Sequence, residues 1–243
     1  MTTTTLSIGQ RLRIVDPFGT FGPTFQGEGS SAGQRALFIR LSRCNLSCPG
    51  CDTPESWDWS RYDPHTDSRW ACVDELVQWV HGQRSTDLVV ITGGEPLLQQ
   101  HGLVPLVETL AEYGQRVEIE TNGTRTPTPE LVAAVTRFNV SPKLAVFGGG
   151  MPPERRIVPE ALQAFAVSGK AVFKFVACGI ADLDEIAELE QQFQLAPVWV
   201  MPAGSTHDEV VAGLRALADP VLAHGWNLTG RFHVLLWGEE RGR

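Results

Sequence analysis

Three cysteines stand close together in this chain of 243 residues, at Cys44, Cys48 and Cys51, in the spacing C-x3-C-x2-C. Three thiolates on one short loop can wrap a single inorganic centre. A protein that holds a [4Fe–4S] cluster as a plain electron carrier normally supplies four cysteines. A loop that supplies three leaves one iron with an open coordination position, and such a position is useful only if a ligand binds there.

Two other interpretations of the cysteine loop stay open. Zinc prefers tetrahedral sites built from C-x2–4-C pairs, and this loop reaches four ligands if Asp52, His65 or Cys72 joins it. Three buried free thiols, or one disulfide and one thiol, also match the spacing. Cys72 and Cys178 stand alone in the sequence, and we expect both to be small buried hydrophobic residues.

Composition and charge exclude several classes of protein. The chain is 42% hydrophobic with a net charge of −8 and shows no basic patch, so we expect no nucleic-acid partner. The longest apolar runs, such as 88–91, are far too short to span a membrane. The first residues lack the pattern of a signal peptide, and the cysteines do not form a secreted disulfide framework. We therefore expect a cytoplasmic protein.

Strands and helices are expected to alternate along the chain. The apolar segment 35–43 is a strand that leads directly into the cysteine loop, and 87–91 is a buried strand that ends at Gly93-Gly94. A last apolar segment lies at 232–237. Further strands are expected at 116–121, 171–176 and 198–201, with a brief strand and loop at 138–143. Helices are expected at 73–84, around 103–110, and at 129–137, 159–167, 182–193 and 206–221.

This alternation predicts an α/β fold with parallel strands and helical crossovers. With about six such strands and no linker, residues 1–243 are expected to form a single domain, a partial and open TIM-like barrel. Its chemistry would lie at the carboxyl ends of the strands. Capping boxes are expected at Asp182 with Glu185 and at Thr206 with Glu209. Residues 1–34 show little periodicity, and the Trp-rich segment 54–70 suggests a packing patch or a cap over the site.

A second motif, Thr92-Gly-Gly-Glu-Pro96, follows the strand at 87–91. Together with the cysteine spacing it resembles the radical S-adenosylmethionine (radical SAM) enzymes. In that superfamily the open iron chelates SAM, and an electron from the cluster cleaves SAM to a 5′-deoxyadenosyl radical. The resemblance implies a [4Fe–4S] cluster held by Cys44, Cys48 and Cys51, SAM as a second cofactor, and no catalytic side chain, because the radical is generated on SAM.

Further motifs resemble one branch, the 7-carboxy-7-deazaguanine synthase (QueE) family. That family contracts the ring of 6-carboxy-5,6,7,8-tetrahydropterin to 7-carboxy-7-deazaguanine with loss of ammonia, in queuosine and 7-deazapurine biosynthesis. The resemblance implies a homodimer that uses Mg²⁺ and receives electrons from a flavodoxin-like or other donor. The matching segments are 25–29 (FQGEG), 38–41 (FIRL), 51–53 (CDT), 118–123 (EIETNG), 141–143 (SPK), 201–204 (MPAG) and 231–238 (RFHVLLWG).

The resemblance also assigns roles to residues. Thr53 would ligate Mg²⁺, although its spacing alone indicates a turn or cap residue. The expected SAM contacts are Gly50, Cys51, Asp52, Gly94, Ser141, Pro142, Lys143, Met201, Pro202, Ala203 and Gly204. The expected contacts with the pterin substrate are Phe25, Gln26, Gly27, Glu28, Arg40, Thr92, Glu120 and His233.

A role for Arg40 can also be argued from its position in the sequence, without the family resemblance. It lies on a strand of mainly apolar residues, where a buried charge without a partner is costly. A substrate carboxylate would satisfy its planar fork in a bidentate pair, whereas the alternative is a solvent-facing arginine. By the same kind of reasoning, His233 could be an ordinary core or edge residue, and the segment 26–29 an ordinary surface loop.

Two competing functions remain at this point. A glycyl-radical activase shares the cysteine spacing but acts on a protein and needs no pterin site. A zinc-stabilised binding module would use the same cysteines without redox chemistry.

Overall fold

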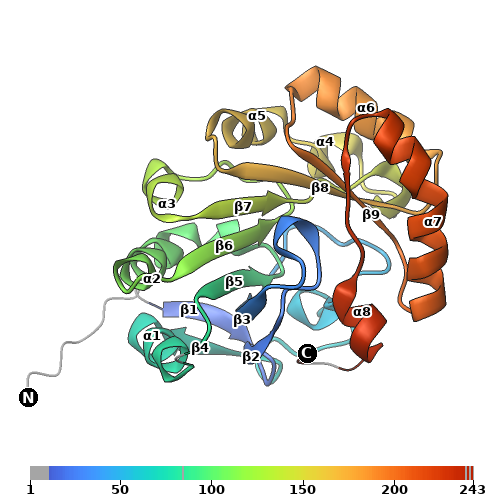
Figure 1. Ribbon diagram of the computed structural model, residues 1–243. Coiled ribbons are helices and arrows are strands. Elements are labelled where there is room, and N and C mark those ends of the chain that lie inside the picture. Colours follow the sequence, from blue (N-terminus) through green and yellow to red (C-terminus); the bar gives the residue numbers. More distant parts are fainter. Residues whose placement is uncertain (1–10, 84, 239, 241, 243) are drawn as a thin grey trace, which may run out of the picture.

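The computed structural model describes residues 11–83, 85–238, 240 and 242, and the expectation of no signal peptide concerns residues outside this range. One ten-stranded sheet runs through the described residues, with helices flanking it (Figure 1). Its strands are β1 (Arg11–Val15), β2 (Thr20–Phe25), β3 (Arg35–Leu41), β4 (Ser68–Cys72), β5 (Leu88–Gly93), β6 (Arg116–Thr121), β7 (Arg137–Val140), β8 (Ala171–Ala177), β9 (Val198–Pro202) and β10 (Asn227–Leu228). The α-helices are α1 (Val73–Gly82), α2 (Gln100–Glu112), α3 (Pro129–Ala134), α4 (Pro153–Arg156), α5 (Pro159–Val167), α6 (Asp182–Phe193), α7 (His207–Ala223) and α8 (Phe232–Trp237).

Parallel pairing dominates the sheet. Strands β3, β5, β6, β7, β8 and β9 are parallel neighbours in that order, and the two-residue β10 extends the series beyond β9. β1, β2 and β4 add antiparallel pairs on the side of β3. Since β10 and β4 stand at opposite ends of the strand order, the barrel is open. The expected α/β fold with about six parallel strands is therefore confirmed.

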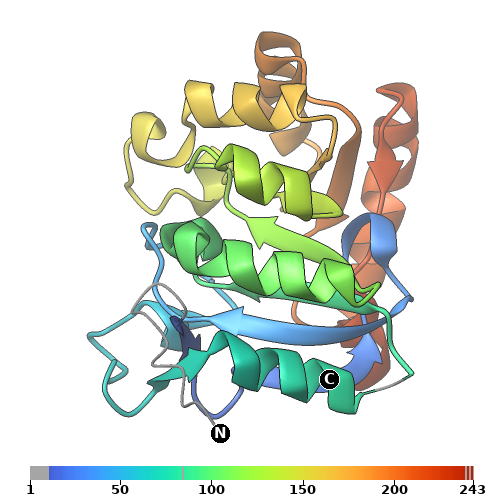
Figure 2. The ribbon, with the colours of Figure 1, turned by 90° about the vertical axis from the view of Figure 1, so that its left-hand side faces the viewer.

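The helices cover the outer face of the sheet. Figure 2 shows α1, α2 and α3 side by side on that face, where α2 contacts both of the others. The predicted apolar face of α1 is buried, including Leu76 and Val80, and it packs into the main core with the strand residues Ile91 and Ile119. Within the described part of the chain, none of the helices combines the length and the apolar character needed to cross a bilayer.

The antiparallel edge was not expected from the sequence. β1 and β2 lie where little periodicity is visible, because both are short and Gly22-Pro23 interrupts the pattern of β2. β4 lies at the end of the Trp-rich segment. Trp70 on that strand and Trp59 before it are 53% and 39% exposed, so the interpretation of these two residues as a packing patch was wrong.

Several helix expectations need correction. The helix expected at 129–137 ends at Ala134, since β7 begins at Arg137. The capping box at 206 and 209 is present, but the one expected at 182 and 185 is not. Asp182 instead accepts from the Cys178 backbone N–H at 2.6 Å. The segment 232–237 is the helix α8, and Cys178 is exposed rather than buried.

Glu95 anchors the cysteine loop to the carboxyl ends of β5 and β6. Its backbone N–H donates to the carbonyl of Arg43, one residue before the first cysteine, at 2.8 Å. Its fully buried carboxylate accepts from the Leu97 N–H at 2.9 Å, the Thr121 hydroxyl at 2.8 Å and the Asn122 N–H at 2.7 Å. Burial raises the pKa of this carboxyl group, and the three donors oppose that shift.

Gly94 explains why the motif has a glycine beside this anchor. A side chain at this position would collide with the backbone carbonyl of Arg43. The turn after β5 therefore fits against the cysteine loop only if residue 94 has no Cβ.

Replacing Glu95 by glutamine is expected to lower the free energy of unfolding by about 2 kcal/mol. The amide nitrogen of Glu95→Gln is a donor, and it must face at least one donor that now points at the carboxylate. Thermal unfolding of anaerobically purified protein measures the loss, with Glu112→Gln at the exposed end of α2 as the control. An unchanged melting temperature in Glu95→Gln would contradict the anchoring role.

Candidate functional site

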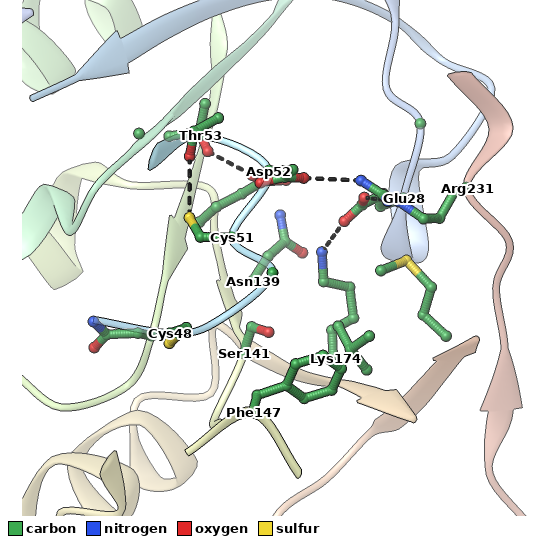
Figure 3. Close-up of a pocket in the computed structure, with 18 of the residues that line it drawn as sticks. Glu28, Cys48, Cys51, Asp52, Thr53, Asn139, Ser141, Phe147, Lys174 and Arg231 are labelled. Carbon is green, nitrogen blue, oxygen red and sulfur yellow. Dashed lines mark hydrogen bonds and ion pairs between the residues drawn. The ribbon is translucent and has the colours of Figure 1, made fainter. Parts of the chain in front are cut away.

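A cavity of about 630 Å³ opens on the inner face of the sheet, at the carboxyl ends of the parallel strands (Figure 3). The three cysteines of the loop line it, as do residues of β2, β3, β5, β6, β7, β8, β9 and α8. Every residue that the sequence assigned to cluster, SAM, Mg²⁺ or substrate lines this cavity except Pro202. Pro202 is buried and faces Gly213 of α7, so its backbone position is close to the site but its ring is not part of the lining.

The cysteine thiols are free and lie at one end of the cavity. Cys44 Sγ accepts from the Leu46 N–H at 3.4 Å and from Asn122 Nδ2 at 3.9 Å. The pKa of the Cys44 thiol is raised to about 11, mainly by burial, with smaller contributions from the nearby Glu95, Cys48 and Cys51. Thiols that repel one another as thiolates, with N–H donors aimed at sulfur, fit a group that supplies compensating positive charge.

A [4Fe–4S] cluster fits this donor set better than a single zinc ion. Among the described residues, no group of three or more Cys, His, Asp and Glu side chains is arranged to hold one metal ion. Of the fourth ligands considered for zinc, His65 and Cys72 do not line the cavity, and Asp52 is paired with Arg231 at 2.8 Å. A cluster distributes its ligands over several irons, so its thiolates need not converge on one point.

The expected SAM-binding segments lie next to the cysteines. Lys143 donates to the Ser141 hydroxyl at 3.0 Å, and its charge lowers the pKa of Cys48, although burial of that thiol raises the pKa more. Ala203 follows β9 and its N–H donates to the carbonyl of Ala177 at 2.8 Å. Lys143 therefore presents a cation near Cys48, which suits the carboxylate of SAM.

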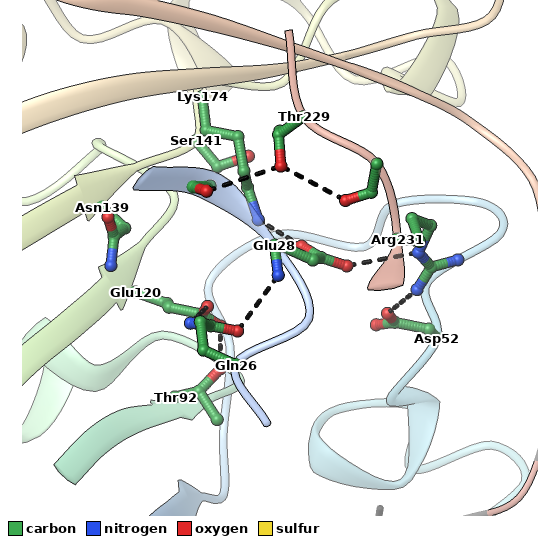
Figure 4. A network of polar contacts seen from close by, with 12 residues as sticks. Gln26, Glu28, Asp52, Thr92, Glu120, Asn139, Ser141, Lys174, Thr229 and Arg231 are labelled. Atoms are coloured by element: carbon green, nitrogen blue, oxygen red, sulfur yellow. Dashed lines mark hydrogen bonds and ion pairs between the residues drawn. The ribbon is translucent and has the colours of Figure 1, made fainter. Parts of the chain in front are cut away.

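A row of polar side chains crosses the cavity on adjacent strands. Arg40 of β3 is in register with Thr92 of β5, and Glu120 of β6 is in register with Asn139 of β7. The Glu120 carboxylate accepts from the Thr92 hydroxyl at 2.7 Å and from Gln26 Nε2 at 3.1 Å (Figure 4). Both donors fix the carboxylate toward the cavity, where each oxygen keeps a lone pair for a ligand N–H.

Arg40 is half-buried and its guanidinium lies over the Phe21 ring, 5.3 Å from the centroid. In the part of the chain that the structure describes, no carboxylate pairs with it. A cation–π contact of this kind uses the positive charge of the guanidinium and leaves its N–H groups for a ligand. The arginine is therefore neither a fully solvent-facing residue nor a member of a protein ion pair.

The structure adds a buried ionic network that was not assigned from the sequence (Figure 4). Lys174 of β8 pairs with Glu28, and Arg231 bridges Glu28 at 3.2 Å and Asp52 at 2.8 Å. Burial alone would raise the pKa of Glu28, but the two cations hold it well below its ordinary value. Lys174 stands in a run of apolar strand residues, and the argument made for Arg40 would have identified it as well.

The helix α8 closes over the segment 26–29. Its Phe232 N–H donates to the carbonyl of Gly27 at 2.7 Å, and a side chain on Gly27 would collide with the His233 ring. Phe25 contacts the Phe232 ring edge-to-face at 6.0 Å between centroids. Burial lowers the pKa of His233, which favours the neutral imidazole. His233 thus reaches the cavity from a helix, not from an edge strand.

Thr53 lies directly beside the third cysteine. Its hydroxyl is 3.7 Å from Cys51 Sγ, and it precedes the short 3-10 helix Pro54–Ser56 without capping it through its side chain. The hydroxyl is thus available to the cavity between the thiol and Asp52 (Figure 3). A single hydroxyl is a weak Mg²⁺ site, so an ion there would need oxygen atoms from substrate and water.

Comparisons with known proteins agree with this geometry. The Radical SAM superfamily model matches residues 38–219. The chain is 34% identical over 241 residues to a 7-carboxy-7-deazaguanine synthase of Pyrobaculum aerophilum, covering 98% of this chain and 100% of the relative. A synthase of the same name from Halobacterium salinarum is 32% identical over 234 residues, covering 89% and 88% of the two chains.

A solved structure gives the same result. The crystal structure of QueE from Escherichia coli superimposes with a TM-score of 0.68 at 26% identity, covering 92% of this chain and 95% of that one. The chain therefore belongs to the radical SAM superfamily and, within it, to the 7-carboxy-7-deazaguanine synthase family.

Proposed function

We propose that this protein is a 7-carboxy-7-deazaguanine synthase, which contracts the ring of 6-carboxy-5,6,7,8-tetrahydropterin and releases ammonia in 7-deazapurine biosynthesis. One observation carries the proposal: the cavity that holds the three cysteines also holds Arg40, an arginine whose N–H groups have no carboxylate partner within the described residues. The family membership supports the same substrate. A protein substrate, as for a glycyl-radical activase, would not require an anion-binding arginine beside the Glu120 carboxylate.

The cofactors follow from the residues that line the cavity. We infer that Cys44, Cys48 and Cys51 hold the [4Fe–4S] cluster as thiolates, and that the segments 141–143 and 201–204 contact SAM. When bound, the cluster and SAM supply the radical that starts the reaction. The protein contributes binding, orientation and exclusion of water.

Arg40 and Glu120 orient the substrate in this proposal. The guanidinium of Arg40, which lies over the Phe21 ring, takes the substrate carboxylate in a bidentate pair. Glu120, fixed by Thr92 and Gln26, accepts an N–H of the pterin. The Thr53 hydroxyl would hold Mg²⁺ as its one protein ligand, and the ion would supply positive charge beside the substrate carboxylate. α8 covers the segment 26–29 and keeps water from this end of the cavity.

Four further parts of the proposal rest on the family resemblance. The whole chain, 1–243, forms one radical SAM domain; one sheet running through the described residues supports this. The protein is a homodimer, and a flavodoxin-like protein or another carrier supplies electrons. It works in the cytoplasm, which agrees with five free cysteines.

Anaerobic turnover tests the function directly. Reconstituted protein with reductant, SAM, Mg²⁺ and 6-carboxytetrahydropterin is expected to give 7-carboxy-7-deazaguanine, with about four iron atoms per chain. Cys48→Ala is expected to lose the cluster and all SAM cleavage, because two thiolates cannot hold the iron. Cys178→Ala, which changes an exposed cysteine outside the cavity, is the control and should keep both. A colourless wild-type protein with one zinc, or no deazaguanine product, would overturn the proposal.

Arg40→Ala is expected to weaken substrate binding by about 10- to 100-fold, the loss of a charge-assisted hydrogen-bonded pair. The variant should keep its iron and some SAM cleavage that is not coupled to product. Arg35→Ala, at the other end of the same strand, is the matched control and should bind substrate normally. Equilibrium binding of the substrate under anaerobic conditions measures the effect. Retained affinity in Arg40→Ala would remove the arginine from the carboxylate site.

Thr53→Ala is expected to raise the Mg²⁺ concentration needed for half-maximal stimulation about tenfold. Thr53→Ser keeps the hydroxyl and should respond like the wild type. Because the hydroxyl lies 3.7 Å from Cys51 Sγ, the iron content of both variants must be measured alongside activity. The same Mg²⁺ response in Thr53→Ala and wild type would exclude this residue from the ion site.

A further inference from the structure

Lys174 is a buried cation in the cavity whose hydrogen-bonding capacity is only partly used. Its side chain is 8% exposed and it lines the cavity from β8. The ammonium pairs with the Glu28 carboxylate, and in the described part of the chain this is its one hydrogen-bond partner. An ammonium carries three N–H donors. Two of them are therefore left for a ligand, in a place where water has little access.

The position of the ammonium is set by negative charge from several elements. Burial alone would lower the pKa of Lys174, but Glu28, Glu120 and Asp52 outweigh it and keep the pKa above its ordinary value. These three carboxylates come from the segment after β2, from β6 and from the cysteine loop. Figures 3 and 4 show the lysine side chain directed from its strand toward Glu28. The cation is thus held in place before any ligand binds.

Other cations of the cavity are committed elsewhere. Arg231 is engaged by Glu28, Asp52 and the carbonyl of Gly204. Lys143 lies beside the thiols and donates to Ser141. Arg40 lies on β3, which β5, β6 and β7 separate from β8 in the sheet order. Thr92, the register partner of Arg40, donates to Glu120, and Glu120 is close enough to Lys174 to raise its pKa. A pterin whose carboxylate pairs with Arg40 would therefore extend past Glu120 toward Lys174.

We propose that Lys174 donates a hydrogen bond to the ring carbonyl oxygen of the pterin pyrimidinone, while Glu28 beside it accepts the neighbouring ring N–H. A lactam presents one acceptor and one donor side by side, and the Lys174–Glu28 pair presents the complementary donor and acceptor. This assignment rests on the proposed function, which supplies the substrate class. It makes Lys174 a specificity-determining residue for a ring with an oxo group at this position.

The test combines one protein change with one ligand change. Lys174→Met removes the donors but keeps the length of the side chain, and the 4-thio counterpart of the substrate replaces the carbonyl oxygen by sulfur, a much weaker acceptor. Anaerobic equilibrium binding to the reconstituted, SAM-loaded protein measures all four combinations. Lys170→Met is the control, since this lysine bonds the carbonyls of Ala133 and Val135 outside the cavity.

The expected result is a loss of substrate affinity of about 10- to 100-fold in Lys174→Met. The wild type and Lys170→Met should bind the thio analogue at least about fivefold more weakly than the substrate, whereas Lys174→Met should bind both about equally. Lys170→Met should keep the substrate-independent SAM cleavage of the wild type, and the iron content should be the same in all three proteins. A role limited to folding would lower affinity for both ligands and leave their ratio as in the wild type.

The outcomes separate this inference from the proposed function. A wild type that neither binds nor converts the carboxytetrahydropterin overturns the function. A wild type that converts it, but binds the oxo and thio compounds equally well, overturns the role of Lys174 even if Lys174→Met does not fold. Unchanged affinity or an unchanged ratio in a folded Lys174→Met protein overturns it as well.

Discussion

The site depends on one constraint: the loop after β3 must be fixed to the ends of β5 and β6 although it is an irregular segment. The Glu95 carboxylate meets this constraint because it accepts three hydrogen bonds, two of them from the end of β6. Asn122 continues the connection, since its side chain donates to Asn45 at 3.0 Å and to Cys44 Sγ at 3.9 Å. The position of Cys44 is thus fixed by hydrogen bonds from the ends of β5 and β6, although Cys44 itself follows β3.

Some charged side chains of the cavity are fully paired within the protein, and others keep N–H donors without a partner in the described residues. Glu28 meets two cations, so neither it nor Arg231 needs a ligand in order to be buried. In the described residues, the Arg40 guanidinium contacts the Phe21 ring but no carboxylate, and the Lys174 ammonium uses one of its three N–H donors, toward Glu28. A ligand with an anionic group at one end and a carbonyl at the other would satisfy both groups. The positions of the unused N–H donors of Arg40 and Lys174 therefore predict the functional groups of the substrate, which the net charge of the cavity does not.

The sequence predicted those elements whose residue types are set by a single local requirement, such as burial of a strand or binding of a metal centre. Mainly apolar runs placed β3, β5, β8 and β9, because parallel strands buried on both faces are rich in apolar residues, and the alternation of Val117, Glu118, Ile119 and Glu120 placed β6. The cluster loop was predicted from the spacing of its three cysteines together with the motif that contains Gly94. β1, β2 and β4 were not predicted because strands of only five or six residues show no clear period, and Gly22-Pro23 also interrupts the pattern of β2. The segment 232–237 was expected only to be apolar, and it forms the helix α8, whose first N–H donates to the carbonyl of Gly27.

Ion pairs between segments that are far apart in the chain could not be predicted from the sequence. Arg231 belongs to the last turn before α8, Glu28 follows β2, and Asp52 lies in the cysteine loop, so no local pattern links them. Yet the guanidinium holds all three segments together and also bonds the carbonyl of Gly204 at 2.8 Å. The Glu28 arm is buried, whereas the Asp52 side chain is 65% exposed, so the two contacts differ in strength. The buried contact with Glu28 therefore contributes more to fixing the start of α8 than the exposed contact with Asp52 does.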